Sequence, residues 1–464
     1  MFLKYIIDFS LRQRVVALSL VALMAFGGYQ ALKTIPINSL PDVTPVQVLV
    51  ITKAGRYSPF DVEKLVSYPI ETAMNGLPEV REVRSVSHFG LSAVTVEFDE
   101  NTDIYFARQM VSQRLQGVAE ALPEGVSIPQ LGPISTALGE IYQYVVHGEG
   151  YSLTELRTIQ DWLIAPQLKT VKGVTEINSF GGFVKQYEVV VNPGKLRQLG
   201  ISLAEISEQI SRNNSVSGGN YLEHNREQYI IRGFGQIAGA TDLGNIIIRR
   251  IENRPVFLKD IADISIGKQL RQGAVTRDGQ GEMVTGIVMM LRGGNGQEVI
   301  ANIEEKIAAI NPSLPEGVRI EKFYDQSDLI GRTTHTIIVN LLEGGFFVIS
   351  VLLLLLGEIR GALIVASVIP LSMLFAFIGM REFGLAANLM SLGAIDFGMV
   401  VDGSVVMMEN TIHRLQSDKD RPALLVIQEA AHEVARPIFF GVLIILMVYV
   451  PIMTFGGMEG ILFR

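Results

Sequence analysis

Cysteine is absent from the 464 residues of this chain, which excludes disulfides, thiolate metal sites and cysteine nucleophiles. Histidine is scarce, and its six scattered residues leave little room for a preformed histidine metal site. A basic run is also missing and the formal net charge is -8, so the composition argues against a nucleic-acid-binding protein.

Apolar residues are abundant, and they make up 48% of the sequence against 19% that are charged. The mean hydropathy is +0.32. Such a chain is too apolar to be disordered and too long for one compact domain. The composition therefore predicts membrane-spanning segments.

Five apolar stretches are each close to the ~20 residues that cross ~30 Å of hydrocarbon. They cover residues 15–33, 337–356, 362–380, 385–411 and 437–455. The first stretch has Gln30 and Lys33 where a cleaved signal peptide needs small residues, which favours an uncleaved anchor. Residues 460–464 resemble the beginning of a further span.

Lysine and arginine in the short flanks predict the orientation of these spans. If the N-terminus is cytoplasmic, most of these residues fall on the cytoplasmic side, and Arg381 is the exception. They are Lys4, Arg12, Arg14, Arg360, Arg414, Lys419, Arg421 and Arg436. We therefore expect the spans to lie in the inner membrane of a double-membraned bacterium, with residues 34–335 in the periplasm.

The external segment has a repeated pattern of strands and helices. Residues 46–52, 82–88 and 93–99 are expected to be strands, and residues 59–75 and 104–122 helices. The second helix ends in LPEGV (122–126), and the same letters recur at 314–318 after a helix expected over residues 297–310. This recurrence indicates a duplicated βαββαβ unit, although chance similarity of two helix-stop sequences also explains it.

The second unit is expected to begin with a strand at residues 140–146 and a helix at 153–171, and to resume at 274–291. A Gly- and Asn-rich segment, from residue 181 to about 268, lies between these parts. Its sequences Asn213-Asn214 and Gly218-Gly219-Asn220 have turn chemistry that suits a long hairpin or protruding loop. Such an insertion is a candidate surface for contacting another chain.

The fourth span carries three carboxyl side chains, those of Asp396, Asp402 and Glu409. An ionised carboxylate at the centre of a spanning helix costs ~2.5–3.5 kcal/mol, so packing alone does not account for them. At 100° per residue, Asp402 and Glu409 nearly share a face, while Asp396 lies about 120° round from Asp402. Carboxyl groups held away from water can gain and lose protons as their surroundings change, so we expect them to relay protons.

Simpler roles stay open for each acid. Glu409 lies near the cytoplasmic end and can reach the headgroups, and a static hydrogen bond between helices would explain the two aspartates. No lysine lies in the interior of an expected span. Either Asp402 is protonated at rest, or its cationic partner lies outside this chain.

Several motifs together resemble the N-terminal part of resistance–nodulation–division (RND) efflux transporters, over essentially the whole chain. The external ones are INSLPDV (37–43), YPIE (68–71), GLP (76–78), FGLS (89–92), TDIYFARQ (102–109) and GPIST (132–136). NLLEG (340–344) and the fourth-span sequence complete the set. Drug-exporting relatives carry two adjacent aspartates, whereas Gly403 follows Asp402 here. This difference favours the heavy-metal cation subfamily of the cobalt–zinc–cadmium type.

The resemblance implies a membrane α-helical bundle plus an α+β periplasmic domain, with ferredoxin-like βαββαβ porter subdomains and an inserted docking subdomain. It implies proton-driven antiport, in which Asp396, Asp402 and Glu409 pass protons and a lysine in a later span supplies the cation. Such a protein is a secondary transporter rather than an enzyme, and it needs no cofactor beyond the proton motive force. It works as a homotrimer in the lipid bilayer with a periplasmic adaptor and an outer-membrane channel.

The corresponding divisions are residues 1–33 for the cytoplasmic N-terminus and first span, and 34–132 for the first porter subdomain. The second porter subdomain takes residues 133–180 and 269–335. The docking subdomain takes 181–268, with a loop that reaches into the neighbouring protomer. Residues 336–464 hold spans two to five and the start of a sixth. Since the family has twelve spans, we expect a chain of this extent to be inactive alone.

Substrate residues are less clearly marked. Glu140, just after GPIST, is a candidate contact for a hard or borderline cation, although an ordinary exposed acid is the simpler interpretation. The pairs Glu223-His224 and His147/Glu149 fit solvated loops better than metal sites. The leading hypothesis is export of divalent metal cations. Export of amphiphilic organic compounds, and a non-transporting accessory or sensor role, are the alternatives.

Overall fold

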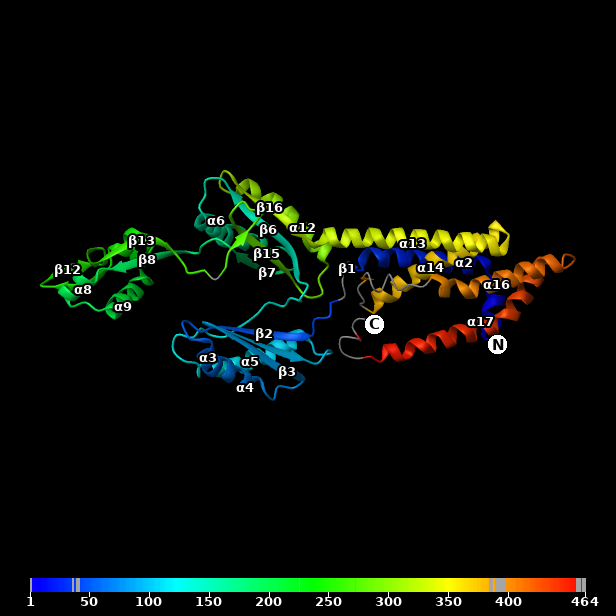
Figure 1. Cartoon of the computed structure of the whole chain (residues 1–464), viewed down its shortest axis with the longest axis horizontal. Helices are drawn as coiled ribbons and strands as arrows, with labels where there is room; N and C mark the ends of the chain where they lie inside the picture. Colours follow the sequence, from blue (N-terminus) through cyan, green and yellow to red (C-terminus); the bar gives the residue numbers. More distant parts are fainter. Residues whose placement is uncertain are drawn as a thin grey trace.

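The computed structural model describes residues 2–35, 37–38, 42–224, 226–271, 273–383, 387–388, 397–455 and 460. Its parts follow one another along a long axis (Figure 1). Long helices form one end, two α/β units form the middle, and a third, smaller α/β unit forms the opposite end.

The first α/β unit is an antiparallel sheet with the strand order β3-β4-β2-β5. The strands are β2 (Val46–Lys53), β3 (Val80–His88), β4 (Leu91–Phe98) and β5 (Gln130–Leu131). Buried side chains alternate along β2 and β4, since successive residues of a strand point to opposite faces. The buried face packs on α4 (Tyr68–Met74) and α5 (Ile104–Ala119) in one hydrophobic core.

The second α/β unit has the same strand order, built from segments far apart in the chain. The neighbours run β16-β6-β15, and β7 pairs with the other edge of β15. The strands are β6 (Glu140–Gly148), β7 (Val174–Phe180), β14 (Val275–Thr276), β15 (Glu282–Met290) and β16 (Val318–Asp325). The covering helices are α6 (Leu153–Ile159), α7 (Ala165–Leu168) and α12 (Gly296–Ile310), which share one core with the sheet. A short 3-10 turn, η3 (Asn311–Ser313), follows α12.

Each unit has a π-helical turn in its first helix, and a nearby proline explains both turns. They are η1 (Glu63–Ser67), between α3 (Pro59–Val62) and α4, and η2 (Gln160–Ile164), between α6 and α7. Each turn ends two residues before a proline, Pro69 or Pro166. A proline has no N–H to donate and its ring crowds the carbonyl four residues earlier, so the helix widens ahead of it. Tyr68 and Ala165 accordingly donate their N–H groups to the carbonyls five residues earlier.

The third unit is inserted between β7 and β14 and has its own small core. Its helices are α8 (Pro193–Leu199), α9 (Leu203–Asn213), α10 (Ala240–Gly244) and α11 (Leu258–Ile261). Its strands include β8 (Lys185–Val191), β11 (Ile247–Ile251), β12 (Arg254–Phe257) and β13 (Ala262–Lys268). Strands β8 and β13 pair antiparallel along their whole length, and they connect this unit to the second one (Figure 1).

The hairpin expected in this insertion is present, but its turn is not where the sequence predicts it. Strands β9 (Val216–His224) and β10 (Glu227–Phe234) pair antiparallel. The Gly-Gly-Asn sequence at 218–220 therefore lies within β9, and the chain reverses around Arg226, whose φ is 68°. The prediction of a turn at 218–220 is wrong because a ladder can include glycine at a modest cost in stability.

The helical part contains three stretches, among the residues described, that are long and apolar enough to cross a membrane. They are Arg14–Thr34, Ile359–Glu382 and Ala423–Ile452, and they overlap the first, third and fifth expected spans. The helices are α1 (Phe2–Arg12), α2 (Arg14–Thr34), α13 (Gln326–Leu356), α14 (Ile359–Glu382), α16 (Phe397–Ser417) and α17 (Ala423–Met453). The apolar stretch of α13 is the shorter Leu342–Val351. Helix α13 begins well before the second span expected at residue 337.

Two other expected span boundaries are wrong. The fourth span is expected from residue 385, but β17 (Ala387–Asn388) lies there and pairs in parallel with β1 (Ile37–Asn38). Backbone groups that pair in this way are not available to a helix. The fifth span is expected to begin at Pro437, which instead lies inside α17, because membrane helices tolerate an internal proline. Residues 461–464, expected to begin a further span, lie outside the described residues.

Candidate functional site

Helix α16 carries two of the three acids that the sequence singles out, and its packing decides where they point. One face meets α17 so closely that a Cβ on Gly403 would lie 2.9 Å from the Cγ2 atom of Ile438. Another face meets α14, where Val405 and Met408 pack against a cluster that contains Ala362. Small residues allow helices to approach this closely in membranes.

Asp402 and Glu409 share a third face of α16. Viewed down the axis of α16 at 100° per residue, Asp402 and Glu409 are rotated from Gly403 by about 100° and 120° in the same direction. The face that meets α14 is rotated further in that direction. Both side chains are exposed. Among the described residues, the ion pairs at this end of the helical part are formed by other acidic side chains. Neither the Asp402 nor the Glu409 carboxylate takes part in these pairs. The two carboxylates therefore form one open stripe, with a spacing of about 10 Å along the helix axis.

The remaining predicted site residues are not brought together with this stripe. Asp396 lies outside the described residues, directly before α16. Glu140 begins β6 in the second unit and is exposed, with Gln143 Nε2 3.4 Å from its Oε2. Glu223 and His224 end β9 in the third unit. In the part of the chain that the structure describes, no group of three or more His, Asp or Glu side chains could hold a metal ion.

A polar network that the sequence analysis missed joins α16 to α17 next to Glu409. Asn410 Nδ2 donates to the carbonyl of Ala430 at 3.0 Å and to Glu433 Oε2 at 3.3 Å. Arg414 Nη2 donates to the same Glu433 oxygen at 2.9 Å. Asn410 lies seven residues after the glycine that meets α17, so both lie on the same face. These bonds fix the rotation of α16 about its axis, and with it the direction of the acidic stripe.

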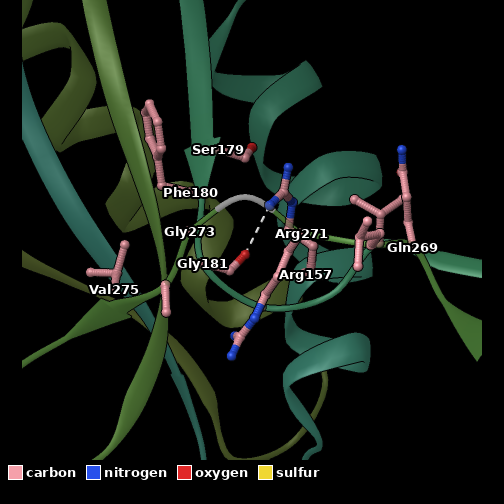
Figure 2. Close-up of a pocket in the computed structure, with 12 residues that line it drawn as sticks. Arg157, Ser179, Phe180, Gly181, Gln269, Arg271, Gly273 and Val275 are labelled. Atoms are coloured by element: carbon pink, nitrogen blue, oxygen red, sulfur yellow. Dashed lines mark hydrogen bonds between the residues drawn. The ribbon is translucent and has the colours of Figure 1, made fainter. Parts of the chain in front are cut away.

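A hollow of about 450 Å³ lies where the third unit joins the second (Figure 2). Arg157 lines it and donates from Nη1 to the carbonyl of Gly181 at 2.8 Å. Arg271 also lines it and forms a two-point ion pair with Glu282, which lowers the pKa of that carboxyl through the hydrogen bond. The Arg271 guanidinium also lies 4.3 Å from the centre of the Phe183 ring. With two arginines in its wall, this hollow does not suit a metal cation.

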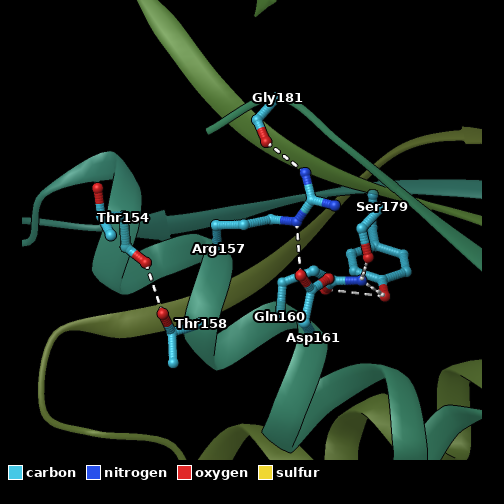
Figure 3. Close-up of polar contacts among 8 residues, drawn as sticks. Thr154, Arg157, Thr158, Gln160, Asp161, Ser179 and Gly181 are labelled. Atoms are coloured by element: carbon cyan, nitrogen blue, oxygen red, sulfur yellow. Dashed lines mark hydrogen bonds and ion pairs between the residues drawn. The ribbon is translucent and has the colours of Figure 1, made fainter. Parts of the chain in front are cut away.

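Polar contacts beside this hollow hold the first helix of the second unit against its sheet (Figure 3). Arg157 Nε donates to Asp161 Oδ2 at 2.8 Å. Gln160 is fully buried, and its amide nitrogen donates to the Tyr144 hydroxyl at 3.0 Å and to Ser179 Oγ at 3.2 Å. Burial raises the pKa of the Tyr144 hydroxyl. These contacts are structural, because each polar group is already satisfied by a neighbour.

A second hollow, of about 690 Å³, lies on the first unit beside η1 and β3. Its wall includes the carboxylates of Glu63 and Glu71 together with Lys64, Ser85 and Ser87. Sequence reasoning missed it, because the two acids are eight residues apart and a regular helix would place them about 80° apart. The π turn between them changes this rotation.

The comparisons with known families, sequences and solved structures each find proteins that are similar to this chain. The AcrB/AcrD/AcrF family model matches residues 6–464. The chain is 46% identical over 478 residues to the cation efflux system protein CzcA of Alcaligenes sp. (strain CT14), which covers 99% of this chain and 45% of that protein. It is 38% identical over 502 residues to the nickel and cobalt resistance protein CnrA of Cupriavidus metallidurans, covering 99% and 46%.

Among solved structures, the X-ray crystal structure of a heavy metal efflux pump, crystal form II, superposes with a TM-score of 0.90 at 36% identity. The superposition covers 99% of this chain and 45% of that one. The chain thus spans about half the length of the relatives that it matches.

Proposed function

Because the chain belongs to the AcrB/AcrD/AcrF family, we propose that it is the N-terminal part of a proton-driven exporter of divalent metal cations. The relatives compared above are a cation efflux protein and a nickel and cobalt resistance protein, and the similar crystal structure is of a heavy metal efflux pump. Gly403, rather than a second aspartate, follows Asp402, which supports the same branch. No feature comparable to these favours an exporter of amphiphilic compounds or a non-transporting accessory.

The open stripe of Asp402 and Glu409 on α16 carries this proposal. A carboxylate within a membrane helix costs ~2.5–3.5 kcal/mol and is retained where it has a function. A proton from the periplasm would reach Asp396 and Asp402 and leave past Glu409 into the cytoplasm. Each protonation removes a charge, changes the partner that the carboxyl group can hold, and so shifts α16 relative to its neighbours.

The α/β units would convert this shift into transport. Helix α13 continues directly from β16, and Asp325 Oδ1 caps it by accepting the Ser327 N–H at 2.6 Å. A displacement of α13 therefore acts on the second unit without an intervening loop. We assign the first and second units to the two porter subdomains, residues 34–132 and residues 133–180 with 269–335.

The third unit, residues 181–268, would be the docking subdomain in the periplasm, and its β9–β10 hairpin would reach into the neighbouring protomer of a homotrimer. A periplasmic adaptor and an outer-membrane channel would complete the assembly around this inner-membrane transporter. For the cargo, we propose Glu140 as a contact, because carboxylate oxygen suits hard or borderline divalent cations.

Substitution of Asp402 in the intact transporter tests the proton relay. Asp402→Asn should abolish resistance to zinc, cobalt or nickel salts, because an amide cannot carry a proton. Growth in these salts measures resistance, and the amount of trimer in membranes shows that assembly is unchanged. Asp420→Asn, at an exposed acid in the loop after α16, should keep full resistance. Retained resistance in Asp402→Asn would rule out proton coupling through this residue.

A further inference from the structure

The N-terminal helix α1 is held against α17 by one of its faces. Leu3 and Ile7 are partly buried on that face. Asp8 Oδ1 accepts a hydrogen bond from Gln428 Nε2 at 2.5 Å and lies 2.9 Å from His432 Nε2. Both partners belong to α17. These contacts fix the rotation of α1, so its opposite face points away from the other helices.

The outward face of α1 is a stripe of two aromatic rings and a cation. Tyr5, Phe9 and Arg12 are spaced at i, i+4 and i+7, so they share this face. Tyr5 is 70% exposed and Phe9 is 42% exposed. Their rings stack with centroids 6.5 Å apart. A helix with this outer face and a charged border is amphipathic, and it is built to lie on a surface rather than to cross a membrane.

The cations of this segment have no acidic partner within the described residues. Lys4, Arg12 and Arg14 are exposed, and the one contact of Arg14 is a hydrogen bond from Nε to a backbone carbonyl. Other arginines differ, since Arg414 and Arg421 each bind a glutamate of α17. Within the described residues, three positive charges thus remain without an acidic partner: that of Arg12 on the aromatic face, that of Lys4 on another side of α1, and that of Arg14 at the start of α2.

The position of α1 beside a spanning helix indicates what its outer face meets. Helix α2 begins at Arg14, and Gln13, with φ -104° and ψ 56°, interrupts the helix between the two. Helix α1 therefore turns away from the axis of α2 at the end of the span. The N-terminus lies at the end of the helical part that is far from the α/β units, beside α17 (Figure 1). Because α2 is long and apolar enough to cross a membrane, we expect its Arg14 end at a membrane surface, where aromatic and cationic side chains anchor helices at headgroup level.

We propose that the outer face of α1 is a docking surface for anionic phospholipid. The two rings lie at the boundary between acyl chains and headgroups, and the three cations bind headgroup phosphate. Charge complementarity selects the partner, because a lipid with a net negative headgroup is attracted to free Lys and Arg while a zwitterionic lipid is not. This surface is separate from the acidic stripe of α16 and does not depend on the direction of transport.

A single-tryptophan probe tests this proposal in the full chain. Trp162 is the only tryptophan in the sequence, and it is 79% exposed on η2 of the second α/β unit. In vesicles, the tryptophan fluorescence of the Trp162→Phe/Phe9→Trp variant should be quenched more by brominated phosphatidylglycerol than by brominated phosphatidylcholine. We expect a preference of at least about fivefold at low ionic strength, and a smaller one in high salt. Tyr5→Trp in the same background gives a second probe of the stripe.

Two controls separate the rings from the charges. The triple substitution Lys4→Gln/Arg12→Gln/Arg14→Gln in the probe background should abolish the preference and leave quenching by both lipids. The unsubstituted chain, whose tryptophan lies in the second α/β unit, gives the baseline. If neither probe is quenched above that baseline, the face is covered by protein and the proposal is overturned. Equal quenching by the two lipids from the start would overturn the selection by charge.

Discussion

Gln160 shows how a single buried side chain can hold a helix to a sheet. It lies on the π turn η2, fully buried, and bridges Tyr144 on β6 to Ser179 on β7. A buried hydroxyl that loses its partner costs much more than the hydrogen bond itself contributes. Sequence reasoning did not find this residue, because a glutamine in an amphipathic helix is usually exposed.

Gln160→Leu is therefore expected to destabilise the second unit by about 1–3 kcal/mol, since the buried Tyr144 hydroxyl and the partly buried Ser179 hydroxyl lose a partner. The midpoint of urea unfolding of the full chain in detergent measures the effect. The double variant Gln160→Leu/Tyr144→Phe should recover much of the loss, because one unsatisfied hydroxyl is then gone. Gln116→Leu, at an exposed position of α5, is the control. Equal midpoints for Gln116→Leu and Gln160→Leu would contradict the bridging role.

The acids of α16 show which features of single residues can be predicted from the sequence. The shared face of Asp402 and Glu409 follows from their spacing alone, and the structure places both side chains on one exposed stripe. The direction of that stripe does not follow from spacing. It depends on the close approach of Gly403 to Ile438 and on the bonds of Asn410 to α17, which are contacts between separate helices. The proton relay itself remains a prediction.

At the scale of helices, α2 and α14 cross at a glycine. A Cβ on Gly28 would lie 2.5 Å from both the Cβ and the carbonyl oxygen of Leu374, and the backbone there cannot yield. A Cβ on the neighbouring Gly27 would lie 3.5 Å from Ile378 Cδ1, an ordinary contact. The two adjacent glycines thus differ sharply in the space around them.

Gly28→Ala should destabilise the helical part by about 1–3 kcal/mol through overpacking, whereas Gly27→Ala should be nearly neutral. The thermal unfolding midpoint of the detergent-solubilised chain measures the difference between the two variants. The same midpoint for both would mean that α2 and α14 do not cross at this residue.

Local elements were predictable and long-range ones were not. Most helices and several strands of the two larger α/β units follow from periodicity and from turn residues such as Pro59, which the structure has at the start of α3. Strands β5, β7 and β16 were not predicted. The start of α16 was missed, because β17 is defined by its pairing with β1, some 350 residues away in the chain. The π turns before Pro69 and Pro166 were also missed, since those prolines alone do not show whether the helix breaks or widens.

At the scale of the whole molecule, the third unit is attached to the second through a narrow junction. On one side the chain passes Gly181 and Gly182, which have φ values of 73° and 64°. A Cβ on Gly181 would lie 2.0 Å from the carbonyl oxygen of Met283, so the position requires glycine. On the other side Arg271 binds Glu282 and lies over Phe183. The orientation of the third unit therefore depends on a few side chains.

Arg271→Met should broaden the distribution of distances between the second and third units, because the ion pair that holds the junction is lost. The chain has no cysteine, so a pair of introduced cysteines with spin labels, one in each unit, reports this distance without background. Arg212→Met removes an exposed ion pair within the third unit itself and should leave the distribution unchanged. An unchanged distribution in Arg271→Met would show that the pair does not hold the junction.

The same junction should respond to acid in a predictable direction. The hydrogen bond from Arg271 lowers the pKa of the Glu282 carboxyl, so the pair is complete at neutral pH. Its contribution is lost as the pH falls through that lowered pKa, below the ~4.3 of a free glutamate. The distance distribution of the unsubstituted chain should then approach that of Arg271→Met, while the variant should not change. Broadening that begins near neutral pH would point to another group.

The short parallel pair of β1 and β17 has a mechanical consequence. Asn38 lies eight residues before Val46, where β2 begins, and Asn388 lies nine residues before Phe397, where α16 begins. A stretch of nine residues reaches at most about 30 Å when fully extended. The pair thus limits the distance between the first sheet and the start of α16. A displacement of that sheet beyond this maximum distance must move α16 or break the β1–β17 pair.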